Sequence, residues 1–143
     1  MKHSVPSVNK EQNIRVIFDD VPDSGGQDII IGDFIDWQPL YDLYIIENDL
    51  VVTFEIAGVD IKDFSIYVKR AYMIINGIRK SSGTLNREYC IFHNLEIPYG
   101  RFSRRIDFPV PIEPRRYQYK IENGILTIKF PILKEKVIPI EEG

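Results

Sequence analysis

The sequence predicts an all-β protein that folds as an antiparallel β-sandwich. Short apolar segments recur from about residue 40 to residue 130, and turn-forming residues separate them at regular intervals. Asn123-Gly124 lies between two of these segments, and this dipeptide is a strong signal for a β-hairpin. The sequence has no heptads, no amphipathic helical segment and no internal repeat. These features favour a two-sheet sandwich over helical folds.

The length and charge of the chain indicate one domain with a separate arm and tail. The 143 residues are enough to form one domain with a substantial core. The net charge of −3 gives no indication of nucleic-acid binding. Residues 1–36 hold three basic and seven acidic residues, whereas residues 37–143 hold fifteen and fourteen. We therefore expect an N-terminal arm at 1–36, a domain at 37–131 and a tail at 132–143.

The cysteine content and hydropathy bear on the compartment. Cys90 is the single cysteine, which excludes an internal disulfide and fits a reducing compartment. The N-terminus has no apolar core of signal-peptide length, and no apolar run approaches the length of a membrane span. We expect a soluble cytoplasmic protein.

Two apolar segments interrupt the polar N-terminal arm. Ile14–Phe18 is short and rich in apolar residues, and Ile29–Trp37 is strongly apolar but interrupted by Gly32. The second segment has two interpretations. It packs on the core as a strand or turn, or it forms an exposed apolar surface that contacts partners.

The first four strands of the sandwich are expected between residues 40 and 75. Leu50–Ile56 alternates so that one of its faces is apolar and points inward. Gly77 follows the fourth strand, where we expect a bulge or a close backbone approach. The other strands of this group are predicted at Leu40–Ile46, Phe64–Val68 and Tyr72–Ile75.

The connection from Lys80 to Pro98 is long and mixed in composition. A connection of this length in a compact β domain usually has a function or is flexible. Within it, Glu88–Phe92 has the composition of a short outlying strand.

The strand predicted at Arg101–Pro109 contains one anomalous residue. Alternation places Arg104 on the apolar face, where a cation is costly unless it has a partner. We expect Arg104 to be an interface cation paired with a carboxylate or with backbone carbonyls. Glu88 or Glu96 of a neighbouring chain is one candidate partner, and a carbonyl of the same sheet is another.

The last two strands are predicted at Tyr117–Ile121 and Ile125–Phe130, with Asn123 and Gly124 as their hairpin turn. The charged tail beyond them contains one apolar island, Ile138-Pro139-Ile140. Because proline keeps this segment extended, both isoleucine side chains project in nearly the same direction. Such a segment suits insertion into an edge groove between two strands of another subunit.

Five short motifs occur in one order along the chain, each beside a predicted strand or in the tail. In order they are Ala57-Gly58-Val59, Gly77-Ile78-Arg79, Tyr99–Arg104, Asn123–Ile128 and Ile138-Pro139-Ile140. In this combination, from about Leu40 to Ile140, the chain resembles the small heat-shock protein family with its α-crystallin domain.

The resemblance implies an immunoglobulin-like sandwich that dimerises and then assembles into larger homo-oligomers. It implies an ATP-independent holdase, a chaperone that binds unfolding proteins and limits their aggregation without a cofactor. In the bacterial, archaeal and plant type, dimers form by exchange of a strand on the long loop. The subunit-interface residues expected on this basis are Arg104, Tyr89, Ile91 and Phe92, and the expected anchor of the oligomer tail is Ile138, Pro139 and Ile140.

The sequence departs from the pattern of the family in three places. Ala57 stands where a proline usually precedes Gly58, and Tyr119 stands where a small alanine is usual. A large ring near the tail groove either narrows it or stacks on the tail. The apolar arm is also short, and its candidate client-binding residues are Ile29, Ile30, Ile31, Phe34, Ile35 and Trp37.

The sequence gives no indication of an enzyme or a metal site. It has no phosphate-binding loop and no nucleophile elbow, and its histidines are His3 and His93. Cys90 and His93 offer two metal ligands, whereas a zinc site needs three or four. We therefore expect no catalytic, cofactor or metal site, and a ligand-binding sandwich would need a polar cluster that is not evident.

An alternative function remains for a sandwich of this kind. A co-chaperone adaptor of the CS-domain type has a similar fold and binds a folded chaperone as an interaction module. The Ile138-Pro139-Ile140 tail and the long loop from Lys80 to Pro98 argue against it. The partners that we expect are other copies of the chain and unfolding proteins, with no nucleic acid and no membrane.

Overall fold

The computed structural model describes residues 13–18, 35–81 and 89–134. Within these ranges the chain forms eight strands and two short 3-10 helices. The strands are β1 (Arg15–Phe18), β2 (Tyr41–Ile46), β3 (Asp49–Glu55), β4 (Phe64–Val68), β5 (Tyr72–Arg79), β6 (Gly100–Asp107), β7 (Gln118–Glu122) and β8 (Ile125–Pro131). The 3-10 helices are η2 (Ile61–Asp63) and η3 (Pro114–Arg116).

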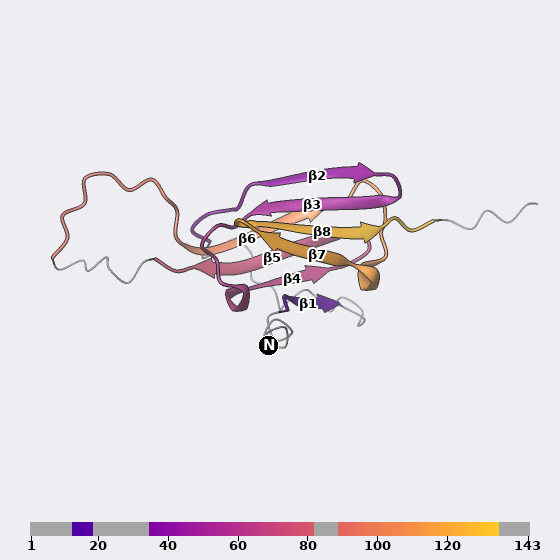
Figure 1. Ribbon diagram of the computed structural model, residues 1–143, viewed down its shortest axis with the longest axis horizontal. Helices are drawn as coiled ribbons and strands as arrows, with labels where there is room; N and C mark the ends of the chain where they lie inside the picture. Colours follow the sequence, from indigo (N-terminus) through magenta and orange to yellow (C-terminus); the bar gives the residue numbers. More distant parts are fainter. Residues whose placement is uncertain (1–12, 19–34, 82–88, 135–143) are drawn as a thin grey trace, which may run out of the picture.

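The strands form two four-stranded sheets that stack face to face (Figure 1). One sheet has the order β1-β4-β5-β6, and the other has the order β2-β3-β8-β7. All pairings are antiparallel except that of β1 with β4, which is parallel. The all-β sandwich predicted from the sequence is confirmed.

The core lies between the two sheets and is built from the inward positions of the strands. Leu50, Val52 and Phe54 of β3 have no exposed surface, as the alternation of this strand predicts. Phe130 of β8 and Ile106 of β6 are equally buried and belong to the same cluster. Since a buried side chain of this size contributes about 1.5–3 kcal/mol, the inner faces account for much of the stability.

Gly77 occupies a point where the backbone of β5 has no room for a side chain. A Cβ atom there would lie 2.6 Å from the carbonyl oxygen of Asp63 and equally close to Phe64 and Phe102. The close approach expected at this glycine is therefore present. β5 continues past it to Arg79 because its pairing with β6 extends to the pair of Arg79 and Gly100.

The turn between β7 and β8 requires two residues in the left-handed region. Asn123 has φ of 53° and Gly124 has φ of 79°. These are the residue types that tolerate positive φ in a two-residue hairpin. The turn also packs closely on the body, because a Cβ on Gly124 would lie 2.9 Å from Ala57.

The outer edge of β6 is covered by the segment that precedes β2. The backbone N–H groups of Asp36 and Trp37 donate to the carbonyl oxygen of Arg101, at 2.8 Å and 3.3 Å. In return the N–H of Arg101 donates to Oδ2 of Asp36 at 2.9 Å. This edge is therefore occupied by the chain's own backbone and side chains.

The long loop between β5 and β6 and the end of β8 lie at opposite ends of the sandwich (Figure 1). Residues 89–99, between β5 and β6, extend far beyond one end of the sheets, and β8 runs to the other end. The described residues include no helix with the length and hydrophobicity that crossing a membrane requires.

Candidate functional site

Arg104 is held within its own chain between the two sheets. It lies on β6 opposite the fully buried Ile75, and its side chain is half-buried. Nη1 donates to the carbonyl oxygen of Pro39 at 3.1 Å, and the guanidinium lies 4.6 Å from the centroid of the Tyr41 ring. This carbonyl belongs to the residue before β2, a strand of the opposite sheet. We had expected, as one of two alternatives, a carbonyl of the sheet that contains Arg104.

Arg79 is a second inward-facing arginine, and the sequence interpretation did not single it out. Only 7% of its surface is exposed, although it lies at the very end of β5. Nε and Nη2 donate to the carbonyl oxygen of Pro98 at 3.0 Å and 2.7 Å, and Nη1 donates to that of Ala57 at 3.0 Å. Its guanidinium also lies over the Trp37 ring, 4.1 Å from the centroid.

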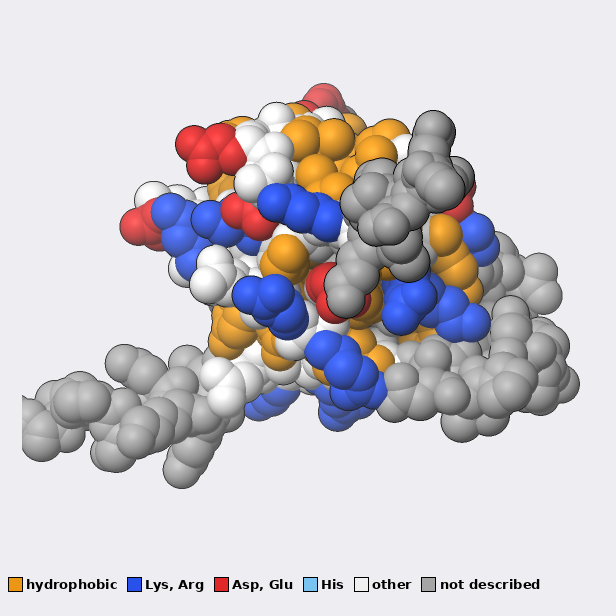
Figure 2. Space-filling model, turned by 90° about the vertical axis from the view of Figure 1, so that its right-hand side faces the viewer, with side chains coloured by type: hydrophobic (Ala, Val, Ile, Leu, Met, Phe, Trp, Pro, Cys, Tyr) orange, Lys and Arg blue, Asp and Glu red, His pale blue; other side chains and the backbone are white. Residues whose placement is uncertain are grey.

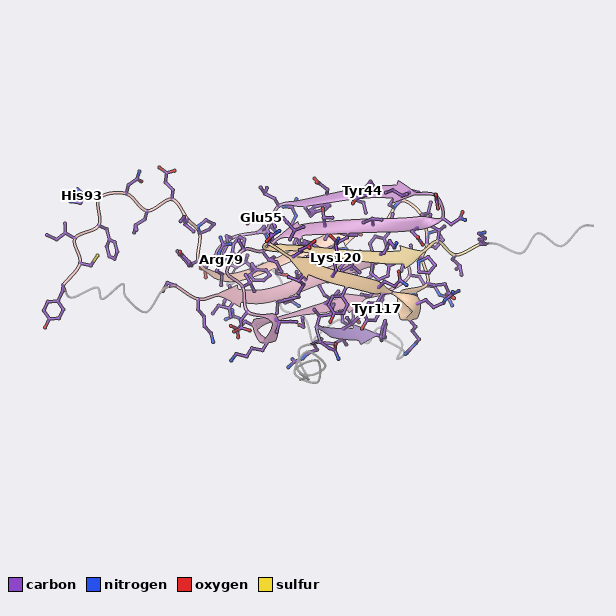
Figure 3. The ribbon with its side chains drawn as sticks, viewed as in Figure 1. Tyr44, Glu55, Arg79, His93, Tyr117 and Lys120 are labelled. Carbon is purple, nitrogen blue, oxygen red and sulfur yellow. The ribbon has the colours of Figure 1, made fainter. Side chains whose placement is uncertain are left out.

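The position of Arg79 makes it the clamp at the base of the long loop. It stands where the loop leaves β5, and it binds Pro98 where the loop returns (Figure 3). The sequence does indicate that Arg79 points inward, because alternation places it on the same face of β5 as Met73, Ile75 and Gly77. The sequence interpretation quoted Arg79 within the motif Gly77-Ile78-Arg79 but ended the predicted strand at Ile75, and so it did not identify the arginine as an inward cation.

The long loop carries a row of exposed apolar side chains away from the body. Tyr89 and Ile91 are 84% and 82% exposed, and Phe92 is 39% exposed. Leu95 and Ile97 continue the row further along the loop. His93 lies in the far part of the loop, well beyond the sandwich (Figure 3). Exposed apolar side chains in such number are typical of a surface that contacts another protein.

The outlying strand predicted near Tyr89–Phe92 is absent in the single chain, since these residues form no strand there. The physical reason is that a strand is stabilised by pairing, and this loop lies apart from every sheet edge of its own chain.

β2 offers a free sheet edge. It is the terminal strand of its sheet, and among the described residues no strand pairs with its second edge. Tyr44, Ile45 and Ile46 at its end are 41%, 46% and 54% exposed. An unpaired edge with apolar side chains is a template for the addition of a further strand.

β1 fills the space between β4 and β7. It pairs in parallel with β4, from Arg15 opposite Ser65 to Phe18 opposite Val68. Its inward side chains reach the core, because Ile14 is 5% exposed and Val16 packs against the same cluster. On the other side, the hydroxyl of Tyr119 on β7 donates to Oδ1 of Asn13 at 3.2 Å.

The end of this groove near Phe18 is basic. A hollow of about 560 Å³ is lined there by Phe18, Lys69, Arg70, Arg115 and the acidic Glu113, among others. The guanidinium of Arg115 lies 4.7 Å from the centroid of the Phe18 ring. Figure 2 shows lysine and arginine side chains gathered beside apolar ones at this end of the molecule.

Several of the predicted site residues lie outside the described residues. These are the tail residues Ile138, Pro139 and Ile140 and the arm residues Ile29, Ile30, Ile31 and Phe34. Of the remaining candidate client-binding residues, Ile35 is half-buried, and Trp37 packs 5.0 Å from the Phe102 ring. Trp37 also donates from Nε1 to the carbonyl oxygen of Gly100, so its ring is engaged with its own domain.

No group of three or more potential metal ligands occurs in the described part of the chain. Cys90 and His93 both lie on the projecting loop.

Comparison with known proteins agrees with this geometry. The model of the Hsp20/alpha crystallin family matches residues 44–141, which is more than half of the chain. The chain belongs to this family. Proteins of the family are small heat-shock proteins, which are non-enzymatic chaperones and are typically oligomeric.

Two curated small heat-shock proteins match the chain in sequence. An 18 kDa heat shock protein from Streptomyces albus G is 26% identical over 96 residues, which is 65% of this chain and 66% of that protein. Small heat shock protein C2 from Rickettsia felis is 30% identical over 94 residues, which is 65% of this chain and 59% of that protein. The match therefore spans less than two thirds of the length of either relative.

A solved structure has the same fold. The small heat-shock protein from Xylella fastidiosa superposes with a TM-score of 0.61 at 25% identity, over 76% of this chain and 98% of that one. The two-sheet sandwich described above is thus the α-crystallin domain.

Proposed function

We propose that this small heat-shock protein is an ATP-independent holdase that assembles from dimers and binds unfolding proteins. The observation that carries the proposal is the row of exposed apolar side chains on the long loop of a chain that belongs to this family. Family membership also supports a cytoplasmic location.

The dimer forms by exchange of the long loop. Tyr89 to Phe92 of one chain add as a strand to the free edge of β2 in the other, and the exposed side chains of both segments become buried together. The clamp at Arg79 supports this arrangement, because it fixes the direction in which the loop leaves the body. The exchange is reciprocal, so each dimer has two copies of the contact.

Larger assemblies form through the tail. Ile138 and Ile140 of one chain insert into the groove between β4 and β7 of another, where they bury two β-branched side chains. Such a contact contributes about 3–6 kcal/mol at most before the cost of ordering the tail, so it is reversible.

The chaperone mechanism is passive. Contacts between subunits cover apolar surface at rest, and dissociation or exchange of subunits uncovers it. Proteins that expose core residues on heating compete for this surface, which keeps them from associating with one another. The arm residues Ile29, Ile30, Ile31, Phe34 and Ile35 contribute to the client-binding surface, and Trp37 joins it when its contacts with Phe102 and Gly100 break.

The test is light scattering of a heat-denatured client protein in the absence of ATP. We expect scattering to fall when the protein is present at equimolar subunits. An equal mass of an unrelated globular protein serves as the control. Unchanged scattering at equimolar subunits would contradict the holdase function, and a strictly monomeric mass would favour a CS-domain-like adaptor.

A further inference from the structure

β1 occupies the place that the proposed function gives to the tail of a neighbouring copy. Ile14, directly before β1, and Val16 of β1 lie two residues apart, and both pack against the core. Ile138 and Ile140 have the same spacing and the same β-branched type. The two segments therefore present equivalent pairs of side chains to a groove.

The groove between β4 and β7 holds an extended segment through contacts along the length of that segment. β4 supplies the backbone pairing, over four successive residues of β1. β7 and the residue before it supply side chains, because Tyr119 of β7 donates to Asn13 and the ring of Tyr117 lies 6.0 Å from that of Phe18. One extended segment fills this width, so two segments cannot pair with the same edge of β4 at once.

The charged residues beside the groove are complementary to the acidic end of the tail, which could bind there in place of β1. If Ile138 and Ile140 take the places of Ile14 and Val16, then Glu141 and Glu142 take the places of Ile17 and Phe18. The hollow beside Phe18 is lined by Lys69, Arg70 and Arg115, with Glu113 as its acidic member. The basic residues outnumber the acidic one, so the acidic end of the tail meets a complementary surface.

We propose that β1 and the tail of a neighbouring copy compete for the groove between β4 and β7. In the isolated chain β1 covers the groove and limits assembly, and a tail that binds releases Ile14, Val16 and Phe18 as additional apolar surface. Assembly and exposure of the arm are thereby coupled. This inference rests on the proposed tail contact, and it names the regulation of that contact.

Binding of a labelled peptide tests the competition. The peptide has the sequence of residues 134–143, and its binding to the full chain is followed by fluorescence anisotropy. The protein carries Ile138→Ser and Ile140→Ser, so that its own tails do not compete. Adding Ile14→Ser and Val16→Ser should raise the affinity for the peptide by about tenfold or more, since β1 no longer covers the groove. A peptide with Glu141→Gln and Glu142→Gln should bind more weakly.

A second variant tests the same point without removing core side chains. Arg15 and Ser65 are directly opposed on β1 and β4, and neither is fully buried. Arg15→Cys with Ser65→Cys, in a protein that also carries Cys90→Ser, allows a disulfide that locks β1 onto β4. The oxidised form should bind the peptide about tenfold more weakly than the reduced form, or not at all.

The outcomes separate the two proposals. Equal peptide affinities in the locked, reduced and Ile14→Ser/Val16→Ser forms would overturn the competition while leaving the tail contact intact. No peptide binding in any form, including the one with β1 released, would overturn both the competition and the tail contact. The scattering test of chaperone activity stands independently of either result.

Discussion

The guanidinium of Arg79 stacks on the indole of Trp37, with 4.1 Å between its central carbon and the ring centroid. This pair joins the end of β5 to the segment that enters the domain from the N-terminal arm. The same arginine binds the carbonyl oxygens of Pro98 and Ala57. One buried cation thus organises the whole end of the sandwich from which the long loop projects.

Replacing Arg79 by alanine should destabilise the domain strongly. It removes three charged hydrogen bonds of a buried guanidinium and leaves the carbonyl oxygens of Pro98 and Ala57 without these donors, at a cost of about 2–4 kcal/mol. Urea unfolding measures the change. Arg79→Lys should recover only part of the loss, because an ammonium lacks the planar fork. Arg105→Ala is the exposed control, expected within about 1 kcal/mol of the parent.

Replacing Arg104 by alanine should weaken both the domain and its assembly. The substitution breaks the link from β6 to Pro39 and removes the cation over Tyr41, both next to the β2 edge proposed for the dimer. Native mass spectrometry should show smaller species, and thermal unfolding should begin at lower temperature. Arg101→Ala, at an exposed position of the same strand, is the control. An Arg104→Ala protein with the mass distribution and thermal stability of the parent would refute this role.

Replacing Tyr89 and Ile91 by serine should dissociate the proposed dimer. Each apolar side chain buried at a contact contributes about 1.5–3 kcal/mol, and a reciprocal dimer contains each one twice. The dissociation constant of the dimer should therefore rise by at least about a hundredfold. Analytical ultracentrifugation over a range of concentrations measures it. His93→Ser on the same loop should leave the constant unchanged, and a dimer insensitive to both variants would place the interface elsewhere.

Ending the chain at Lys136 should remove the large assemblies and leave dimers. The shortened chain lacks Ile138 and Ile140 but keeps the long loop and β2. Native mass spectrometry of the full and shortened chains, side by side, gives the answer. Persistence of the large assemblies would show that the tail does not build them, and loss of the dimers as well would show that the two contacts are not separate.

Replacing Gly77 by alanine should destabilise the domain without any loss of polar contacts. The added methyl group would meet the carbonyl oxygen of Asp63, the Cβ atom of Phe64 and the ring of Phe102, none of which can withdraw freely. Overpacking of this kind costs about 1–3 kcal/mol in urea unfolding. Ser81→Ala, at an exposed position just beyond β5, should change stability by less than about 0.5 kcal/mol. If the Gly77→Ala protein were as stable as the parent, then β5 could move away from Asp63, Phe64 and Phe102 at little cost in free energy.

The sandwich was predictable because its signals are local. Alternation in Leu50–Ile56 and the Asn123-Gly124 turn each depend on a few adjacent residues, and both segments have the structure that their sequence predicts. The strand β1, Arg15–Phe18, was not recognised within the apolar segment Ile14–Phe18, although its inward residues alternate. Four residues give too short a pattern, and the stability of β1 comes from β4 and β7, which are distant in sequence.

The arginines show where sequence reasoning succeeds and where it stops. Alternation identified Arg104 as an inward cation, but not its partner, because Pro39 is 65 residues away and contributes a carbonyl that any residue could offer. Arg79 was named only as part of the motif Gly77-Ile78-Arg79, because the predicted strand ended at Ile75 and its alternation was not followed past Gly77. In fact this glycine allows β5 to continue past a crowded point and to place one more side chain inward.

The edges of the two sheets are covered unequally. β1 pairs with β4, and the backbone of residues 36–37 bonds to β6, whereas among the described residues no segment pairs with the outer edge of β2. In the proposed dimer, the β2 edge of each chain accepts a strand and the long loop of each chain supplies one. A reciprocal exchange would satisfy both within a pair, so the β2 edge of neither chain would remain open to a third chain. Strand addition at β2 would thereby end with the closed dimer, and this edge would not seed the open-ended ribbons to which exposed β-edges otherwise lead.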